Sequence, residues 1–155
     1  MRGKFLIAAA AIMLPGVLTA QTNDPEGRAQ WTPSGIRWEA APGVTVPGMQ
    51  QATLAGDPAK SGRYTIRMRL PAGYKVAPHA YDSGREATVI SGTLHFSYGD
   101  KPLPEGLAAL PPGSFFVQPA NVPFYFEARE PVELQISGDG PAKRPKFSNP
   151  QDEPK

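Results

Sequence analysis

The amino-acid sequence predicts an all-β domain, either a sandwich or a closed barrel of short strands. Glycine and proline are frequent, with 16 and 19 among 155 residues, as in proteins that join many strands by tight turns. The 40% of hydrophobic residues can supply a core, so a disordered chain explains this composition less well. After residue 20 no segment has the period of a helix. The length suits a single domain.

The first 20 residues have the three parts of a secretory signal peptide. Met1–Lys4 carry two positive charges, Phe5–Leu14 form an apolar run, and Val17–Ala20 end in a small residue suited to cleavage. The run is too short to span a bilayer. A buried N-terminal helix, the alternative, explains the flanking charges less well. We therefore expect a mature chain from Gln21 that is periplasmic or secreted and has no membrane span after cleavage.

Charge and cysteine content exclude several classes of function. Of the 16 lysines and arginines, Arg2 and Lys4 lie in the signal segment, which leaves 14 against 14 acidic residues in the mature chain. A chain without net charge gives no indication of nucleic-acid binding. The sequence has no cysteine, which excludes disulfides and thiolate metal ligands.

A loose polar leader at residues 21–34 is expected to precede the barrel, which we place at residues 35–138. The first strand is predicted at Ile36–Glu39 and the second at Met49–Leu54. Ala55–Pro58, with a glycine and a proline, predicts the turn that closes the second strand.

The clearest strand is Arg63–Leu70, where apolar and polar residues alternate over eight positions. The apolar set is Tyr64, Ile66, Met68 and Leu70, and the other set is Arg63, Thr65, Arg67 and Arg69. A period of two predicts a strand with one apolar and one basic face. We favour a solvated outer face for the arginines over the alternative, a basic lining for an anionic ligand.

The stretch Pro71–Gly99 contains the candidate site. It opens with a Pro-Ala-Gly turn, continues as a strand to His79, and crosses a polar loop. A β-hairpin is then expected, with arms at Glu86–Ser91 and Thr93–Tyr98 and a glycine at the bend. His79 is one of two histidines and lies at a strand end beside a loop, where binding residues are common.

The remaining strands are predicted at Gly113–Val117, Val122–Ala128 and Pro131–Ser137. Lys101–Pro112, before them, is a proline-rich loop suited to covering one mouth of a barrel. Residues 139–155 are polar and rich in proline, and we expect them to form a mostly unpaired tail.

The spacing of three glycines, a histidine and a proline matches two motifs of the cupin family. The sequence therefore resembles that family. Gly73, His79 and Gly92 match the first motif, and Gly113 and Pro119 match the second. The resemblance covers most of the predicted barrel. It implies a jelly-roll barrel, also called a double-stranded β-helix, and it allows a homodimer formed through the sheets.

Many cupins bind iron, manganese, nickel or zinc through three histidines and a glutamate, and most of these positions differ here. Only His79 is kept. Tyr81 stands at the second histidine position of the first motif, and Phe124 at the histidine position of the second. Direct spacing places Arg85 at the glutamate position, and a shift of one residue would place Glu86 there.

The residues predicted to line a pocket are His79, Tyr81, Arg85, Glu86, His95 and Phe124. His79 and Glu86 are the metal-ligand candidates, and two ligands are too few for a divalent catalytic site, which usually has three. His95 alternates with apolar residues on its strand, so a hydrogen-bonded strand histidine is the favoured interpretation over a ligand. No catalytic residue is assigned and no cofactor is favoured.

We favour an exported, metal-free barrel that binds a small molecule or acts as an interaction module. The alternative is an atypical metal-dependent cupin enzyme, of the dioxygenase, isomerase or decarboxylase type, that uses His79 and Glu86. A third hypothesis is a structural protein whose phenylalanines fill the barrel. The ligand itself is not predicted by the sequence, because a fold does not specify its function.

Overall fold

In a computed structural model, the structure describes residues 28–41, 48–103, 105–143 and 146–147. This part of the chain forms eleven strands in two antiparallel sheets, and its one helical segment is the 3-10 turn η1 (Pro33–Gly35). The predicted all-β class is therefore confirmed. Within these residues, no helix has the length and hydrophobicity needed to cross a membrane. The predicted signal segment and the first part of the leader lie outside the described residues.

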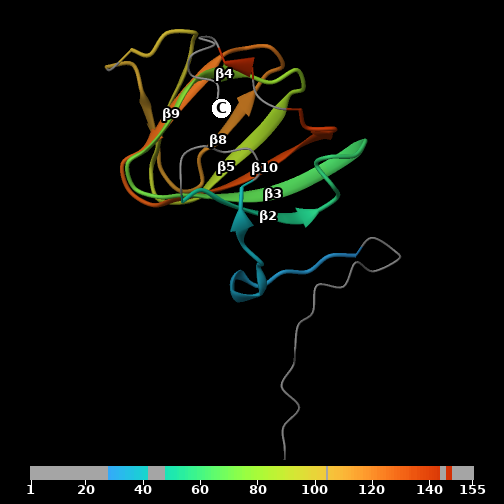
Figure 1. The fold of residues 1–155 in the computed structure, drawn as a ribbon. Coiled ribbons are helices and arrows are strands. Elements are labelled where there is room, and N and C mark those ends of the chain that lie inside the picture. Colours follow the sequence, from blue (N-terminus) through green and yellow to red (C-terminus); the bar gives the residue numbers. More distant parts are fainter. Residues whose placement is uncertain (1–27, 42–47, 104, 144–145, 148–155) are drawn as a thin grey trace, which may run out of the picture.

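The two sheets face each other across the core (Figure 1). The first sheet has the order β1-β2-β3-β10-β5-β8. Its strands are β1 (Glu39–Ala40), β2 (Gln50–Ala55), β3 (Gly62–Leu70), β10 (Val132–Gly140), β5 (Arg85–Ser91) and β8 (Phe115–Gln118). The second has the order β11-β4-β9-β6-β7. Its strands are β11 (Lys146–Phe147), β4 (Tyr74–Ala80), β9 (Phe124–Ala128), β6 (Leu94–Tyr98) and β7 (Ala108–Leu110).

The core lies between the sheets and is filled by the inward residues of both. The largest fully buried side chains are Tyr64, Phe124, Leu70, Leu94, Leu134 and Val89. Inward and outward positions alternate along β3, β5 and β10, as expected for strands with one face on a core. The apolar face predicted for Arg63–Leu70 is thus confirmed.

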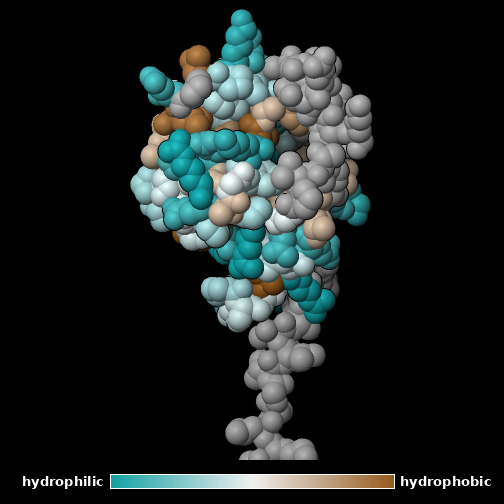
Figure 2. Space-filling model, turned by 60° about the vertical axis from the view of Figure 1, so that its left-hand side comes forward, coloured by the Kyte–Doolittle hydropathy of each residue, from teal (hydrophilic) through white to brown (hydrophobic). Residues whose placement is uncertain are grey.

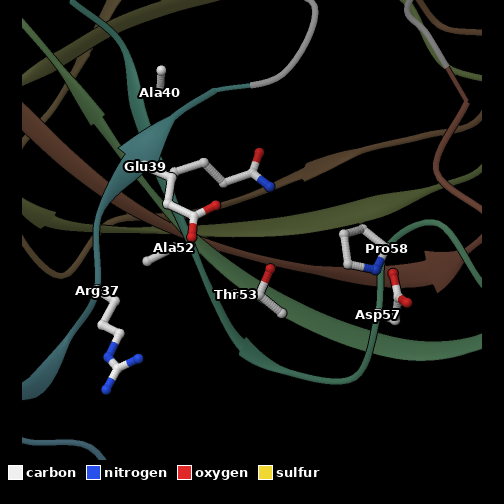
Figure 3. Close-up of a pocket in the computed structure, with 8 residues that line it drawn as sticks. Arg37, Glu39, Ala40, Ala52, Thr53, Asp57 and Pro58 are labelled. Atoms are coloured by element: carbon white, nitrogen blue, oxygen red, sulfur yellow. The ribbon is translucent and has the colours of Figure 1, made fainter. Parts of the chain in front are cut away.

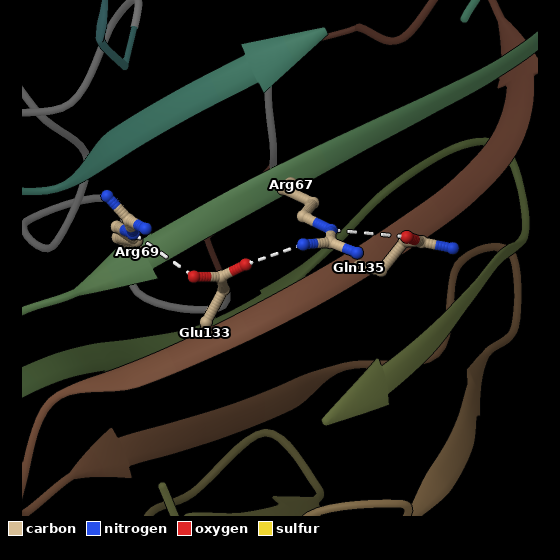
Figure 4. A network of polar contacts seen from close by, with 4 residues as sticks. All are labelled: Arg67, Arg69, Glu133 and Gln135. Atoms are coloured by element: carbon tan, nitrogen blue, oxygen red, sulfur yellow. Dashed lines mark hydrogen bonds and ion pairs between the residues drawn. The ribbon is translucent and has the colours of Figure 1, made fainter. Parts of the chain in front are cut away.

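The basic face of β3 lies on the outside of the barrel, as favoured from the sequence. Arg67 and Arg69 donate hydrogen bonds to the two carboxylate oxygens of Glu133 on β10, at 2.9 and 3.1 Å. Arg67 also donates to Gln135 at 3.3 Å, and the Arg69 guanidinium lies 3.8 Å from the ring centroid of Trp38. Figure 4 shows this network on the outer face of the two strands. Hydrophilic residues also cover much of the face seen in Figure 2.

The Glu133 network should contribute measurably to stability. The Glu133 side chain is only 13% exposed and holds two arginines, so Glu133→Gln is expected to lower the free energy of unfolding by about 1–2 kcal/mol. Glu86→Gln is the matched control, because Glu86 pairs with Arg63 at 3.1 Å while both side chains are half exposed. That pair should contribute less than about 0.5 kcal/mol. Urea unfolding of both variants checks the difference, and equal losses would contradict it.

The expected hairpin at Gly92 is wrong. β5 pairs with β10 and β8 in one sheet, whereas β6 pairs with β9 and β7 in the other. Gly92 is therefore a corner at which the chain leaves one sheet for the other. It has a φ of +70°, a conformation that glycine adopts without a steric penalty.

Two strands were not predicted from the sequence, and both lie at sheet edges. β7 falls inside the segment expected to be a loop and pairs with β6. β11 falls inside the expected tail, where Lys146 and Phe147 pair with Ala80 and His79 of β4. Strands of two or three residues have no detectable period, which explains why the sequence does not indicate them. The leader also ends in contact with the barrel, because the Trp31 indole donates to the Leu54 carbonyl at 2.7 Å.

Candidate ligand site

His79 lies inside the barrel near the end of β4, packed among aromatic rings. Its side chain is 3% exposed, and Phe124 of β9 is its cross-strand neighbour, with ring centroids 4.3 Å apart. The rings of Tyr81 and Phe147 each lie 5.5 Å from the His79 ring. We refer to His79, Tyr81, Phe124 and Phe147 as the aromatic wall. The packing explains why a phenylalanine is tolerated at the motif position of Phe124.

The surroundings keep the His79 imidazole neutral. Its Nδ1 lies 2.8 Å from the Ala77 carbonyl oxygen. A carbonyl can only accept, so Nδ1 carries the proton and Nε2 carries the lone pair. Burial lowers the pKa of His79 from 6.5 to about 4; the hydrogen bond to Ala77 opposes this shift and the charge of Arg85 reinforces it.

Opposite the aromatic wall, polar side chains form one row across four neighbouring strands. The pairing register places Tyr64 of β3 beside Gly138 of β10, Gly138 beside Arg85 of β5, and Arg85 beside Gln118 of β8. Tyr64, Arg85 and Gln118 are 1%, 8% and 4% exposed. We refer to these three side chains as the polar row. They occupy interior positions because each lies two residues from a buried core residue of its own strand, and residues two apart share a face. These neighbours are Ile66, Ala87 and Phe116.

Each member of the polar row has an atom without a hydrogen-bond partner among the described residues. These atoms are the Tyr64 hydroxyl, Arg85 Nε and Gln118 Oε1, and all are shut off from solvent. Buried polar groups are almost always paired, since an unpaired one costs about 1–3 kcal/mol. Three in a single row are therefore an unusual concentration of unmet hydrogen-bonding capacity.

Gly138 lets the polar row come together. A Cβ built on Gly138 would lie 2.9 Å from the Tyr64 hydroxyl oxygen and 3.1 Å from Arg85 Cγ. Tyr64 and Arg85 thus lie directly over the bare backbone of β10. Arg85 also contacts the segment that follows β4, because its guanidinium carbon lies 3.3 Å from the ring centroid of Tyr81, a cation–π distance.

Four of the six residues predicted to line a pocket lie together, and two do not. His79, Tyr81, Phe124 and Arg85 meet in the interior. Glu86 points outward and pairs with Arg63, because one residue along a strand changes the face. His95 is half-buried and lies on the outer face of β6, between the buried Leu94 and Phe96. Its Nδ1 has no described hydrogen-bond partner, unlike the paired histidine expected from the sequence.

The interior does not fit a divalent metal of the kind that cupins bind. Within the described residues, no three His, Cys, Asp or Glu side chains lie close enough to hold an ion. The two metal-ligand candidates are separated, since His79 is inside and Glu86 is outside. Arg85 adds a positive charge where the motif places a glutamate, and this charge disfavours a bound cation.

Sequence reasoning missed Tyr64, Gln118 and Phe147 as site residues. Tyr64 appeared as one more apolar residue of an alternating strand. Gln118 precedes a Pro-Ala-Asn turn and has no distinguishing local pattern. Phe147 could have been recognised from the sequence, because it is the one aromatic residue in an otherwise polar terminal segment. Such a residue indicates that the segment packs against another part of the fold.

A separate pocket of about 280 Å³ lies at the β1 edge of the first sheet, away from β8 (Figure 3). Its lining comes from β1, β2 and the adjoining segments. The residues are Arg37, Glu39, Ala40, Gln51, Ala52, Thr53, Asp57 and Pro58. None of them belongs to the aromatic wall or the polar row, so this pocket is distinct from the barrel interior.

Solved structures resemble this fold although their sequences differ. A polyketide cyclase, RemF from Streptomyces resistomycificus, is 12% identical with a TM-score of 0.68, over 82% of this chain and 89% of the cyclase. An RmlC-like cupin from Shewanella frigidimarina is 17% identical with a TM-score of 0.56, over 74% and 91%. The chain has the cupin fold. A chain from the crystal structures of the DMSP lyases RdDddP and RnDddQII is 18% identical with a TM-score of 0.58, over 74% of this chain and 63% of that chain.

No protein-family model matches the sequence, and no curated protein is similar to it. Identities of this size support the cupin fold and carry no activity to this chain. The site of this cupin barrel must therefore be interpreted from its own residues. At the positions where the cupin motifs place metal ligands, this chain has one histidine, aromatic residues and an arginine. The buried polar atoms without hydrogen-bond partners lie on the sheet opposite that histidine.

Proposed function

We propose that this chain is an exported cupin barrel that binds a small organic molecule in its interior, between the aromatic wall and the polar row. The observation that carries the proposal is the set of three buried polar atoms without partners. A protein that only needed a stable core would gain by replacing these groups with apolar ones. Binding sites commonly combine aromatic walls with a few convergent polar groups.

The proposed site works without a metal ion, because its chemistry is that of hydrogen bonding and ring packing. Elemental analysis of the purified protein, after incubation with iron, manganese, nickel and zinc, tests this part. We expect no stoichiometric metal. About one ion per chain, lost in His79→Ala, would contradict the proposal and favour a metal-dependent enzyme.

Gln118→Met separates a binding role from a structural one. If the Gln118 amide serves a ligand, the apolar variant should be more stable without ligand by about 1 kcal/mol, and should lose ligand binding. Gln135→Met is the matched control, because Gln135 accepts a hydrogen bond from Arg67 on the outer face and should not affect binding. Thermal unfolding is measured with benzoate, benzamide and benzylamine and with acetate, acetamide and ethylamine.

An increase in the melting temperature with any of these probes, abolished in Gln118→Met and kept in Gln135→Met, supports the proposed function. The proposal fails if no probe of any charge stabilises the protein and Gln118→Met is less stable than the parent. In that case the amide would be a structural group and the barrel a filled core.

A further inference from the structure

The interior of the barrel contains a positive charge without a negative partner. Arg85 is 8% exposed, and no described acidic side chain pairs with it. The two acids nearest in sequence already have cations: Asp82 pairs with Lys143 at 3.1 Å, and Glu86 pairs with Arg63 at 3.1 Å. An isolated buried charge is strongly unfavourable and is normally compensated by an ion of opposite sign.

Among the described residues, no other charged group in the interior balances Arg85. Apart from tyrosines, His79 is the one other titratable side chain buried in this part of the described barrel. Its pKa of about 4 leaves it uncharged at neutral pH. Tyr81 supports the guanidinium through its ring face, which attracts a cation without neutralising it. The described interior therefore has one fixed positive charge at the end of the barrel where His79 lies.

We infer that the ligand is a small organic carboxylate, whose negative charge is bound by Arg85. This inference rests on the proposed function and specifies the chemical class of its ligand. The planar guanidinium fork matches the two oxygens of a carboxylate. A single cation matches a monoanion better than a phosphate, which carries more charge.

The other two members of the polar row, Tyr64 and Gln118, can also bind a carboxylate. The Tyr64 hydroxyl can donate to a carboxylate oxygen, and the Gln118 amide can present its NH₂ group after rotation about its last bond. Tyr64 and Arg85 both lie over Gly138, so their polar atoms can converge on one bound group. The aromatic wall faces them and would contact the apolar part of the acid.

Position in the strand explains how Arg85 can reach a ligand. Arg85 is the first residue of β5 and follows the exposed Gly84. The charge thus lies at an end of the barrel and not at its middle. The loop before it is connected to the turn after β8 by a 2.7 Å hydrogen bond from the Asn121 amide to the Tyr81 carbonyl, which fixes this end of the barrel around the guanidinium.

The test compares acids with their uncharged amides by isothermal titration calorimetry. Benzoate and benzamide have nearly the same shape, as do acetate and acetamide, and only the first of each pair is an anion. We expect the acid of at least one pair to bind the parent protein, and to bind it more tightly than its amide. Arg85→Met should weaken that acid by about tenfold or more and weaken the amide, which loses only a neutral hydrogen bond, by less.

Two further variants keep the test decisive. Arg85→Lys retains the charge without the fork and should keep a reduced preference for the acid. Arg63→Met removes a cation from the outer face and should leave binding unchanged. If Arg85→Met does not fold, the acid and amide titrations of the parent and Arg85→Lys still decide the matter.

Several outcomes would overturn the inference. Equal binding of acid and amide, or acid binding that survives Arg85→Met, would show an uncharged ligand. Preferential binding of benzylamine or ethylamine would also overturn it. In these cases the proposed function would stand, because a small molecule still binds. Tighter binding of inorganic phosphate than of either acid would replace the carboxylate by a phosphate. Absence of binding by every probe would overturn the carboxylate, and together with a Gln118→Met variant less stable than the parent it would also contradict the proposed function.

Discussion

Replacing Gly92 by alanine is expected to lower the free energy of unfolding by about 3–4 kcal/mol. The residue has a φ of +70°, which is unfavourable for any side chain with a Cβ. An added Cβ would lie 2.2 Å from the Pro131 carbonyl oxygen and 3.1 Å from Val132 Cα. Since both neighbours are backbone atoms at the start of β10, the overlap cannot be relieved by rotating a side chain.

Gly113→Ala is the matched control for this prediction. Gly113 has a similar φ of +87°, but a Cβ there would meet nothing within 4 Å. The Gly113→Ala substitution should therefore lower the free energy of unfolding only by the conformational penalty of a positive φ, about 1–2 kcal/mol. Urea unfolding of both variants separates backbone strain from steric overlap. If Gly92→Ala lost no more stability than Gly113→Ala, the close packing of this corner would be disproved.

Gly92 also illustrates which part of the fold the sequence predicts. The two strands beside it were predicted because alternation is a local property, visible within six or seven residues. Their pairing was predicted wrongly, because a short turn is compatible with a hairpin or with a corner between sheets. Their partners are β10 for β5 and β9 for β6, which lie about 47 and about 30 residues further along the chain at the middle of each pairing. The spacing of the motif glycines, in contrast, correctly indicated the cupin fold.

At the candidate site, spacing alone could place His79 opposite Phe124, because both positions follow from the two cupin motifs. It left Arg85 and Glu86 as alternatives, since a shift of one residue in the preceding loop exchanges the inward and outward faces. The structure has Arg85 inside and Glu86 outside. Gln118 could not have been found in this way, because its role depends on being the cross-strand neighbour of Arg85, which is a tertiary relation.

The buried, neutral His79 predicts a loss of stability in mild acid. In the unfolded chain the imidazole binds a proton near its ordinary pKa of 6.5, whereas in the folded protein it does so only near pH 4. Above pH 6.5 both states are neutral and the stabilisation is complete. As the pH falls from 6.5 to 4, only the unfolded state gains the proton, so the free energy of unfolding should decrease by about 3 kcal/mol.

His79→Gln should abolish this decrease, because the amide does not titrate, whereas His95→Gln should keep it. Three acidic groups whose pKa values are lowered by ion pairs and hydrogen bonds, Asp57, Asp82 and Glu127, lose their contribution as the pH falls through their ordinary pKa values of 3.8 to 4.5 and below. They overlap only the acid end of the range, so the difference between the parent and His79→Gln, measured by urea unfolding at a series of pH values from 4 to 7, isolates the histidine. A parent protein with constant stability across this range would show that folded His79 binds its proton as readily as the unfolded chain does. Below pH 6.5 its charge would then lie beside that of Arg85, and in mild acid the interior would bind anions through two cations instead of one.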